Sequence, residues 1–287
     1  MPDEFANLAA VVEDDVARAL AEDIGSGDLT AQLVPAGNTA KATVISRVPA
    51  VICGALWFNA VFRRLDPQVD IEWSGTGGDG NLVQPGQQLC TLEGNARALL
   101  AGERTALNFL QMLSAVATAT RRYVDAISGT RAQIVDTRKT LPGLRIAEKY
   151  AVRVGGGVNH RIGLFDGILI KENHITAAGG IAAAFEQAQH AAPSGVWVQV
   201  EVENLDQLRE ALAAGAKMIL LDNMDLGQLR AAVQLNAGRA QLEASGGVTL
   251  DNVRAIAETG VDRISIGSLT KDIAAVDLSL RFDTATR

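Results

Sequence analysis

Six short apolar runs in the second half of the chain each end in residues that could take part in chemistry. Their types are sorted by position: cations follow the first two runs, carboxylates the next two, and small residues the last two. In chain order these residues are Thr137, Arg138, Lys139 and Lys171, then Glu201 and Asp222, then Ser245, Gly246, Gly247, Gly267 and Ser268. Ordinary loop residues would also be polar, but they would not be expected to sort by role in this way.

Each of these three groups suits one part of an anionic, phosphorylated substrate. Cations hold anionic groups by charge-assisted hydrogen bonds. Two carboxylates from adjacent strands suit one Mg²⁺, which commonly takes one or two carboxylates together with substrate oxygens and water. Small residues in front of helices present free backbone N–H groups to a phosphate, aided by the helix dipole. The pattern therefore predicts a Mg²⁺-assisted site for such a substrate.

A further segment, residues 155–161 (GGGVNHR), lies between the first two runs. Three glycines let the backbone fold back tightly, so that His160 and Arg161 can turn toward the same pocket. For His160 alone, a purely structural role, in which the ring hydrogen-bonds only within the protein, is an equally good interpretation. Beside Arg161, in a basic part of the chain, we favour contact with substrate.

The distribution of charge supports an anion site. The chain has a formal net charge of −7, yet residues 97–171 contain 12 Lys or Arg against 5 Asp or Glu, so this segment is +7 and the remainder is −14. A basic centre in an acidic protein suggests a focused pocket for a small anion, although scattered surface charges would give the same composition. The net negative charge argues against nonspecific binding of nucleic acid.

The runs that carry these residues predict the strands of a parallel sheet. They lie at 132–136, 167–170, 196–200, 217–221, 241–244 and 263–266, with helical patterns between them such as 205–214, 227–235 and 250–258. Near-continuous apolar strands that alternate with helices are typical of a sheet covered by helices. We expect an incomplete α/β barrel with the site at the carboxyl ends of its strands. A doubly wound open sheet is the alternative, but no strand is followed by GxGxxG.

Residues 1 to about 110 have the pattern of an α+β domain. A helix is expected at 13–22 and strands at 40–48, 69–73 and 88–93, with glycine-containing turns at 75–80 and 84–88. The turn at 75–80 lacks the lysine of a phosphate-binding loop. The stretch QPGQQLCTLEG resembles a hairpin of biotinyl and lipoyl carriers but has no lysine for attachment. A long helix at 102–127 is expected to bridge the two halves.

Compartment is inferred from cysteines and from apolar runs. Cys53 and Cys90 lie in apolar settings without a CxxC pattern, so we expect buried, reduced thiols. The N-terminus is acidic and has no apolar signal core, and no run of 18 apolar residues occurs. We expect a cytoplasmic protein without a membrane span.

Several of these motifs together resemble one family. The stretch DTRKTLPGLRIAEKYAVRVGGGVNHRIGLFDGILIKENHI, residues 136–175, resembles the signature of the quinolinate phosphoribosyltransferases, also called carboxylating nicotinate-nucleotide pyrophosphorylases. The likeness continues through EVEN at 201–204, LDN at 221–223, EASGGV at 243–248 and SIGS at 265–268. It also covers EDIGSGDLT at 22–30 and ERTALNFLQMLS at 103–114.

The resemblance implies an α/β protein with two domains. An N-terminal α/β sandwich would occupy residues 1–110, with the C-terminal segment 275–287 as a candidate addition to it. An incomplete α/β (TIM-like) barrel of about six parallel strands, at 111–274, would carry the active site. The family works as a homodimer in which each site takes an arginine from the neighbouring subunit, here Arg104. A higher oligomer is left open.

The resemblance also implies roles for single residues. Quinolinate would be bound by Arg138, His160, Arg161, Lys171 and the neighbour's Arg104, and Thr137 would also contact substrate. Lys139 would contact both substrate and pyrophosphate, Glu201 and Asp222 would contact Mg²⁺ and ribose, and Ser245–Gly247 with Gly267–Ser268 would hold the 5′-phosphate. The catalytic set would be Lys139, Lys171, Glu201 and Asp222.

The implied reaction joins quinolinate to the phosphoribosyl group of phosphoribosyl pyrophosphate and releases pyrophosphate and CO₂, with no organic cofactor. One alternative is a non-decarboxylating relative such as nicotinate phosphoribosyltransferase, or one of the family's molybdenum-associated members. Another is a non-catalytic anion-binding or carrier protein. The number of cations favours a dicarboxylate substrate, and the paired Glu201 and Asp222 favour an enzyme.

Overall fold

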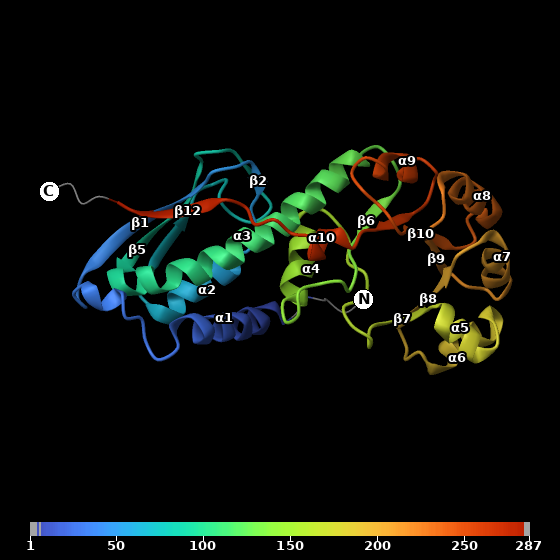
Figure 1. The fold of residues 1–287 in the computed structure, drawn as a ribbon, viewed down its shortest axis with the longest axis horizontal. Helices are drawn as coiled ribbons and strands as arrows, with labels where there is room; N and C mark the ends of the chain where they lie inside the picture. The colour runs from blue at the N-terminus through green and yellow to red at the C-terminus, as the bar shows by residue number, and fades with distance from the viewer. Residues whose placement is uncertain (1–4, 6, 284–287) are drawn as a thin grey trace. The chain divides into compact units, whose positions relative to one another are not determined.

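The structure, a computed structural model, describes residue 5 and residues 7–283. By contacts the chain divides into two units (Figure 1). We call residues 122–140 and 157–271 the barrel unit, and the described residues up to 121 with 141–156 and 272–283 the sandwich unit. The domain boundaries expected from the sequence stay a prediction. Their ends at 1–4, 6 and 284–287 lie outside the described residues.

Six parallel strands form the sheet of the barrel unit. They are β6 (Gln133–Val135), β7 (Gly167–Ile170), β8 (Trp197–Val202), β9 (Met218–Asp222), β10 (Gln241–Ser245) and β11 (Arg263–Ser265). Their order is β6-β11-β10-β9-β8-β7, so each strand from β7 to β11 lies beside the next one in the chain. A doubly wound sheet reverses its strand order at a switch point. The sheet therefore confirms the incomplete barrel and excludes that alternative.

Helices cover the outer face of this sheet (Figure 1). They are α5 (Glu172–Ala178), α6 (Ile181–Ala191), α7 (Leu205–Ala213), α8 (Leu226–Asn236), α9 (Val253–Ala257) and α10 (Ser268–Lys271). Strand residues such as Val200, Ile219, Leu221, Leu242 and Ile264 are buried in one cluster with apolar residues of these helices. They supply the apolar core that holds the strand ends in place.

The opposite face of the same strands is partly polar. Glu243 of β10 lies level with Leu220 of β9 and with Arg263 of β11, and Gln199 of β8 lies level with Met218. Successive side chains of a strand point to opposite faces, so these residues point away from the helices and into the barrel. The apolar strands expected from the sequence are present, and the barrel interior is in addition partly filled by an amide and charged groups.

The sandwich unit is built on an antiparallel sheet with the order β12-β1-β5-β3. Its strands are β1 (Thr39–Ser46), β3 (Asp70–Trp73), β5 (Gln88–Asn95) and β12 (Leu278–Phe282), and β2 (Ala50–Val51) pairs with β4 (Leu82–Val83). Its helices are α1 (Leu8–Ile24), α2 (Ala55–Leu65), α4 (Arg145–Val154) and the first part of α3 (Ala96–Ala126), with a short 3₁₀ turn at Ala31–Leu33. Trp57, Phe58 and Phe62 of α2 are fully buried in its core.

Most elements expected in this half are present. The long helix begins at Ala96 rather than at 102, and α2 was not predicted. Cys53 and Cys90 are buried free thiols, as expected, and burial raises the pKa of Cys90 to about 12. Among the described residues, no helix is both long and apolar enough to cross a membrane.

Candidate active site

The loop that follows β6 is anchored by the buried carboxylate of Asp136. Its Oδ1 accepts the backbone N–H of His160 at 2.8 Å, and its Oδ2 accepts the Asn159 amide at 2.6 Å. The bridge between Val135 and Val158 lies just before these bonds. The glycine-rich segment is therefore fixed beside β6, at the edge where the strand order leaves the barrel open.

Lys139 lies exposed in the same loop, over the strand end of β11. Its backbone N–H donates to Thr137 Oγ1 at 3.1 Å, and its carbonyl accepts the Thr270 hydroxyl at 2.7 Å. A Cβ on Gly267 would lie 3.0 Å from Lys139 Cδ. The absence of a side chain at Gly267 therefore leaves the space that the lysine stem occupies, and the structure brings Thr137, Lys139 and Gly267 together.

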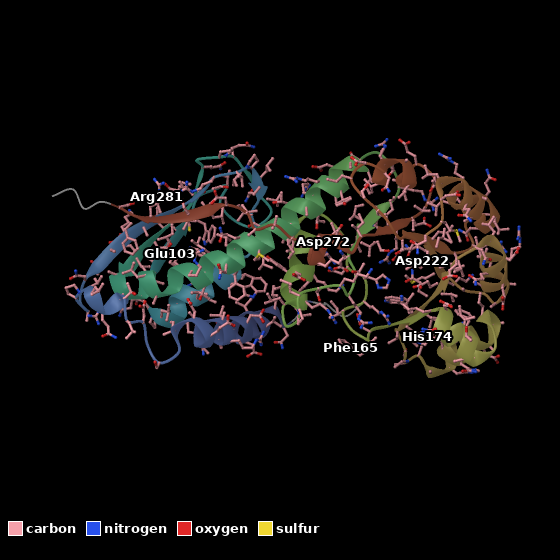
Figure 2. The ribbon with its side chains drawn as sticks, in the orientation of Figure 1. Glu103, Phe165, His174, Asp222, Asp272 and Arg281 are labelled. Carbon is pink, nitrogen blue, oxygen red and sulfur yellow. The ribbon has the colours of Figure 1, made fainter. Side chains whose placement is uncertain are left out.

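Arg161 is held by the loop that leads into β7. Its guanidinium donates to the carbonyl of Gly167 at 3.0 Å. The Asp166 carboxylate accepts the N–H groups of Ile162 and Gly163 at 2.7 and 2.8 Å. These bonds make a compact turn that carries the exposed side chain of Phe165 (Figure 2) and fixes the base of the Arg161 side chain.

Two guanidinium groups lie close enough to repel each other. Burial lowers the pKa of Arg161, and the charge of Arg138 lowers it further, whereas Asp166 and Glu201 act in the opposite direction. A shift of this kind means that the surroundings disfavour the second positive charge. An anion bound near Arg138 and Arg161 would offset this cost, so the pair suits an anionic ligand.

Lys171 and Glu201 form an ion pair across two neighbouring strand ends. Lys171 Nζ lies 3.0 Å from Glu201 Oε2, and the carboxylate is the more buried partner. Lys171 also precedes α5, and its N–H donates to the ring of His174, which lies on that helix (Figure 2). The lysine stem is thereby directed from β7 toward β8.

Asp222 ends β9, the next strand (Figure 2). Glu201 lies level with Leu220, two residues before Asp222, so both carboxylates point to the same face about 7 Å apart along the strands. Asn223 has φ 54°, a left-handed conformation, and its amide donates to Asp222 Oδ2 at 2.7 Å. The two carboxylates thus face the same space from adjacent strands.

Tight glycine turns follow β10. Gly246 has φ 97° and Gly247 has φ 60°, both in the region that favours glycine. A Cβ on Gly246 would lie 2.1 Å from Asn223 Oδ1, so no larger residue fits there without a shift. Helix α9 begins only at Val253 and α10 has four residues. A phosphate at this edge would therefore be bound mainly by hydrogen bonds from backbone N–H groups, with little contribution from a helix dipole.

His160 is placed differently from the other expected site residues. It is 7% exposed, its ring packs edge-on against Trp197, and both ring nitrogens have partners in the protein. Nδ1 accepts the Arg161 N–H at 2.9 Å, and Nε2 lies 2.9 Å from Gln199 Oε1. Its ring therefore points into the barrel interior. Arg104 lies in the sandwich unit, exposed on α3.

The sequence analysis missed the polar residues inside the barrel. Gln199, Glu243 and Arg263 interrupt apolar strands at positions that share one face. A signal was present, because an amide or a charge in the middle of an apolar run is costly to bury unless it is paired.

Comparisons with known proteins cover nearly the whole chain. The family model "Quinolinate phosphoribosyl transferase, N-terminal domain" matches residues 28–114, and the corresponding C-terminal domain matches residues 116–281. The chain is 44% identical to the nicotinate-nucleotide pyrophosphorylase [carboxylating] of Mycobacterium leprae, over 93% of this chain and 95% of the relative. It is 44% identical to a probable enzyme of the same name from Bacillus subtilis, over 90% of this chain and 89% of that one.

A solved structure extends the likeness to three dimensions. The nicotinate-nucleotide pyrophosphorylase of Francisella tularensis is 46% identical and superposes with a TM-score of 0.92. The match covers 96% of this chain and 97% of that one. The match therefore extends over both halves of this chain.

Proposed function

The chain belongs to the quinolinate phosphoribosyltransferase family, and from this premise we propose how its own residues carry out the family's reaction. The enzyme is a decarboxylating pentosyltransferase of NAD biosynthesis. It transfers the phosphoribosyl group of phosphoribosyl pyrophosphate to quinolinate and gives nicotinate mononucleotide, pyrophosphate and CO₂.

Quinolinate binds where the cations gather after β6 and β7. The observation that carries this proposal is the pair of guanidinium groups at this edge: Arg161 is held at the Gly167 carbonyl, and its pKa is lowered first by burial and then by the charge of Arg138. Lys171 adds a third cation on the next strand end. A dicarboxylate can offset several clustered cations, whereas one carboxylate leaves more of their repulsion in place.

Phosphoribosyl pyrophosphate binds along the other strand ends. Lys139 binds the pyrophosphate. Glu201 and Asp222 contact the ribose and would hold Mg²⁺. The donor set fits this ion, because Mg²⁺ favours carboxylate oxygens and keeps water and phosphate oxygens as further ligands. No cluster of three or more His, Cys, Asp or Glu residues that could hold a metal occurs within the described part of the chain, so substrate oxygens would have to complete the site. When bound, Mg²⁺ would neutralise charge on the pyrophosphate.

The 5′-phosphate is held by the turns after β10 and β11. Gly246 and Gly247 offer backbone N–H groups in a turn that only glycine fits. The hydroxyls of Ser245 and Ser268 and the N–H of Gly267 complete the set of donors. Each hydrogen bond to the phosphate dianion is charge-assisted, so several of them together bind it tightly.

The chemistry needs little from the protein beyond position and charge. The ring nitrogen of quinolinate attacks the anomeric carbon as pyrophosphate leaves, and Lys139 stabilises the charge that develops on the leaving group. The nitrogen then carries a positive charge. When the adjacent carboxylate leaves as CO₂, its bonding electrons remain on the ring carbon beside that nitrogen, and a proton then adds to this carbon.

The assembly is a homodimer with shared sites in a cytoplasmic protein. Arg104 is exposed on α3 and belongs to the sandwich unit, whereas the strand-end residues belong to the barrel unit. Arg104 of the partner subunit adds the fourth cation to the quinolinate site. The net charge of −7 disfavours nucleic acid as a partner.

Substrate choice tests this function. The purified chain is incubated with phosphoribosyl pyrophosphate, Mg²⁺ and either quinolinate or nicotinate, and nicotinate mononucleotide is measured by chromatography. Quinolinate should be used far better, because only it supplies two carboxylates to the cations. Equal or better turnover of nicotinate would favour the non-decarboxylating alternative.

A further inference from the structure

We infer that Gln199 and Glu243, inside the barrel, position Arg161 for the substrate carboxylate by way of the imidazole of His160. His160 is then a positioning residue, in place of the direct substrate contact expected from the sequence. The inference rests on the proposed function, because it concerns the quinolinate half of that site.

A continuous series of hydrogen bonds joins the four residues. The Arg161 N–H donates to His160 Nδ1 at 2.9 Å, so this nitrogen carries no proton. The neutral ring then has its proton on Nε2, which lies 2.9 Å from Gln199 Oε1. The Gln199 amide donates in turn to Glu243 Oε2 at 3.3 Å. Each group thus sets the orientation of the next.

Glu243 anchors this series deep in the barrel. It has no exposed surface, its Oε2 lies 3.1 Å from Arg263 Nε, and its Oε1 lies 3.6 Å from His160 Nε2. Since Glu243 can only accept hydrogen bonds when ionised, the Gln199 amide must turn its NH₂ group toward it. The Gln199 oxygen therefore faces the histidine, and only one tautomer of His160 satisfies both neighbours.

The consequence for the site lies at the other end of the series. The N–H of His160 is bound by Asp136, the N–H of Arg161 by the His160 ring, and the Arg161 guanidinium by the Gly167 carbonyl. The arginine is thus held at its backbone and at its tip. Buried ion pairs add little net stability compared with apolar side chains of similar size. We therefore assign to Gln199 and Glu243 the placement of Arg161 rather than a contribution to stability.

A swap of the two interior side chains tests the inference. Gln199→Glu places a carboxylate against Glu243, so the orientation of His160 should be lost and KM for quinolinate should rise about tenfold. Adding Glu243→Gln to this variant exchanges the amide and the carboxylate. The amide at position 243 can then donate to the carboxylate at position 199. KM for quinolinate should then return to within about threefold of the unmodified enzyme. KM for phosphoribosyl pyrophosphate should change less than about twofold in both variants.

Gln199→Met and His160→Ala provide a second, independent test. If the two residues act in one series, the double variant should raise KM for quinolinate no more than the worse single variant. Leu220→Met is the matched control, because Leu220 lies level with Glu243 in the barrel but outside the series, and its KM values should stay unchanged. Thermal unfolding of each variant identifies any that fail to fold.

The outcomes separate this inference from the proposed function. If the unmodified chain forms no nicotinate mononucleotide, the proposed function fails. If it does, the inference is overturned by an unchanged KM for quinolinate in Gln199→Glu and Gln199→Met, by a swap that rescues nothing, or by additive effects of His160→Ala and Gln199→Met. Quinolinate binding measured by calorimetry gives the same comparison without turnover.

Discussion

Truncation of Arg161 should weaken quinolinate binding without disturbing the fold. In Arg161→Ala the backbone N–H remains, so its bond to His160 Nδ1 can persist, and only the guanidinium with its bond to Gly167 is lost. The loop also keeps the two bonds that Asp166 accepts from Ile162 and Gly163. The change therefore removes one cation from the site and little else.

The magnitude follows from the setting of the guanidinium. A hydrogen bond to a charged group contributes about 1.5–3 kcal/mol net. Arg161 is half-buried, so water weakens this interaction only in part, and removing it also relieves the repulsion from Arg138. We expect the Kd of quinolinate to rise about 10- to 150-fold.

Isothermal titration calorimetry with quinolinate is the assay. The Kd of quinolinate for Arg161→Lys should lie between those of the unmodified protein and Arg161→Ala. An ammonium keeps the charge but cannot present the planar pair of N–H donors that an arginine offers a carboxylate. Arg230→Ala is the matched control, since it removes the same charge from the exposed side of α8, and its Kd should not change. A change of less than about twofold in folded Arg161→Ala would refute the assignment of a carboxylate to this arginine.

Three further predictions concern the metal, the dimer and stability. Excess EDTA should abolish turnover and Asp222→Ala should reduce it sharply, as measured by pyrophosphate release; full activity in EDTA would contradict a role for Mg²⁺ at that carboxylate. Inactive Arg104→Ala and Lys139→Ala chains should regain activity when mixed, because a heterodimer contains one site with both residues intact; no recovery in verified heterodimers would argue that Arg104 acts within its own chain. Burial raises the pKa of Glu148 to about 7, so the folded state holds this proton more tightly than the unfolded chain, and that contribution is lost as pH rises from about 4.5 to about 7. The Tm of Glu148→Gln should therefore fall less over this range than that of the unmodified protein, and identical slopes would count against the shift.

The strand-end residues were predictable because their placement depends on local patterns. An apolar run with a polar end predicts β8 and β9 whatever their position in the sheet. Because these strands are parallel, Glu201 and Asp222 lie at the same edge. Gly246 and Gly267 were likewise expected at the ends of β10 and β11, but the close approaches of Asn223 and Lys139 that a side chain there would block are visible only in the structure.

Other features depend on partners far away in the sequence. Helix α2 starts where Asp79 accepts the N–H of Ala55, so its beginning is fixed from outside the segment. Strand β12 pairs with β1; the family resemblance suggested that this segment joins the N-terminal half, but the residues of β12 alone do not identify the strand that it pairs with. The orientation of His160 depends on Gln199, which can be identified as its partner only once the strand order is known.

Release of CO₂ from labelled quinolinate tests the central claim most directly. The carboxyl carbon beside the ring nitrogen is labelled, and the chain is supplied with phosphoribosyl pyrophosphate and Mg²⁺. The account predicts labelled CO₂ in an amount equal to the nicotinate mononucleotide formed, and none when phosphoribosyl pyrophosphate is withheld. Nicotinate mononucleotide formed from nicotinate, with no labelled CO₂ from quinolinate, would contradict it.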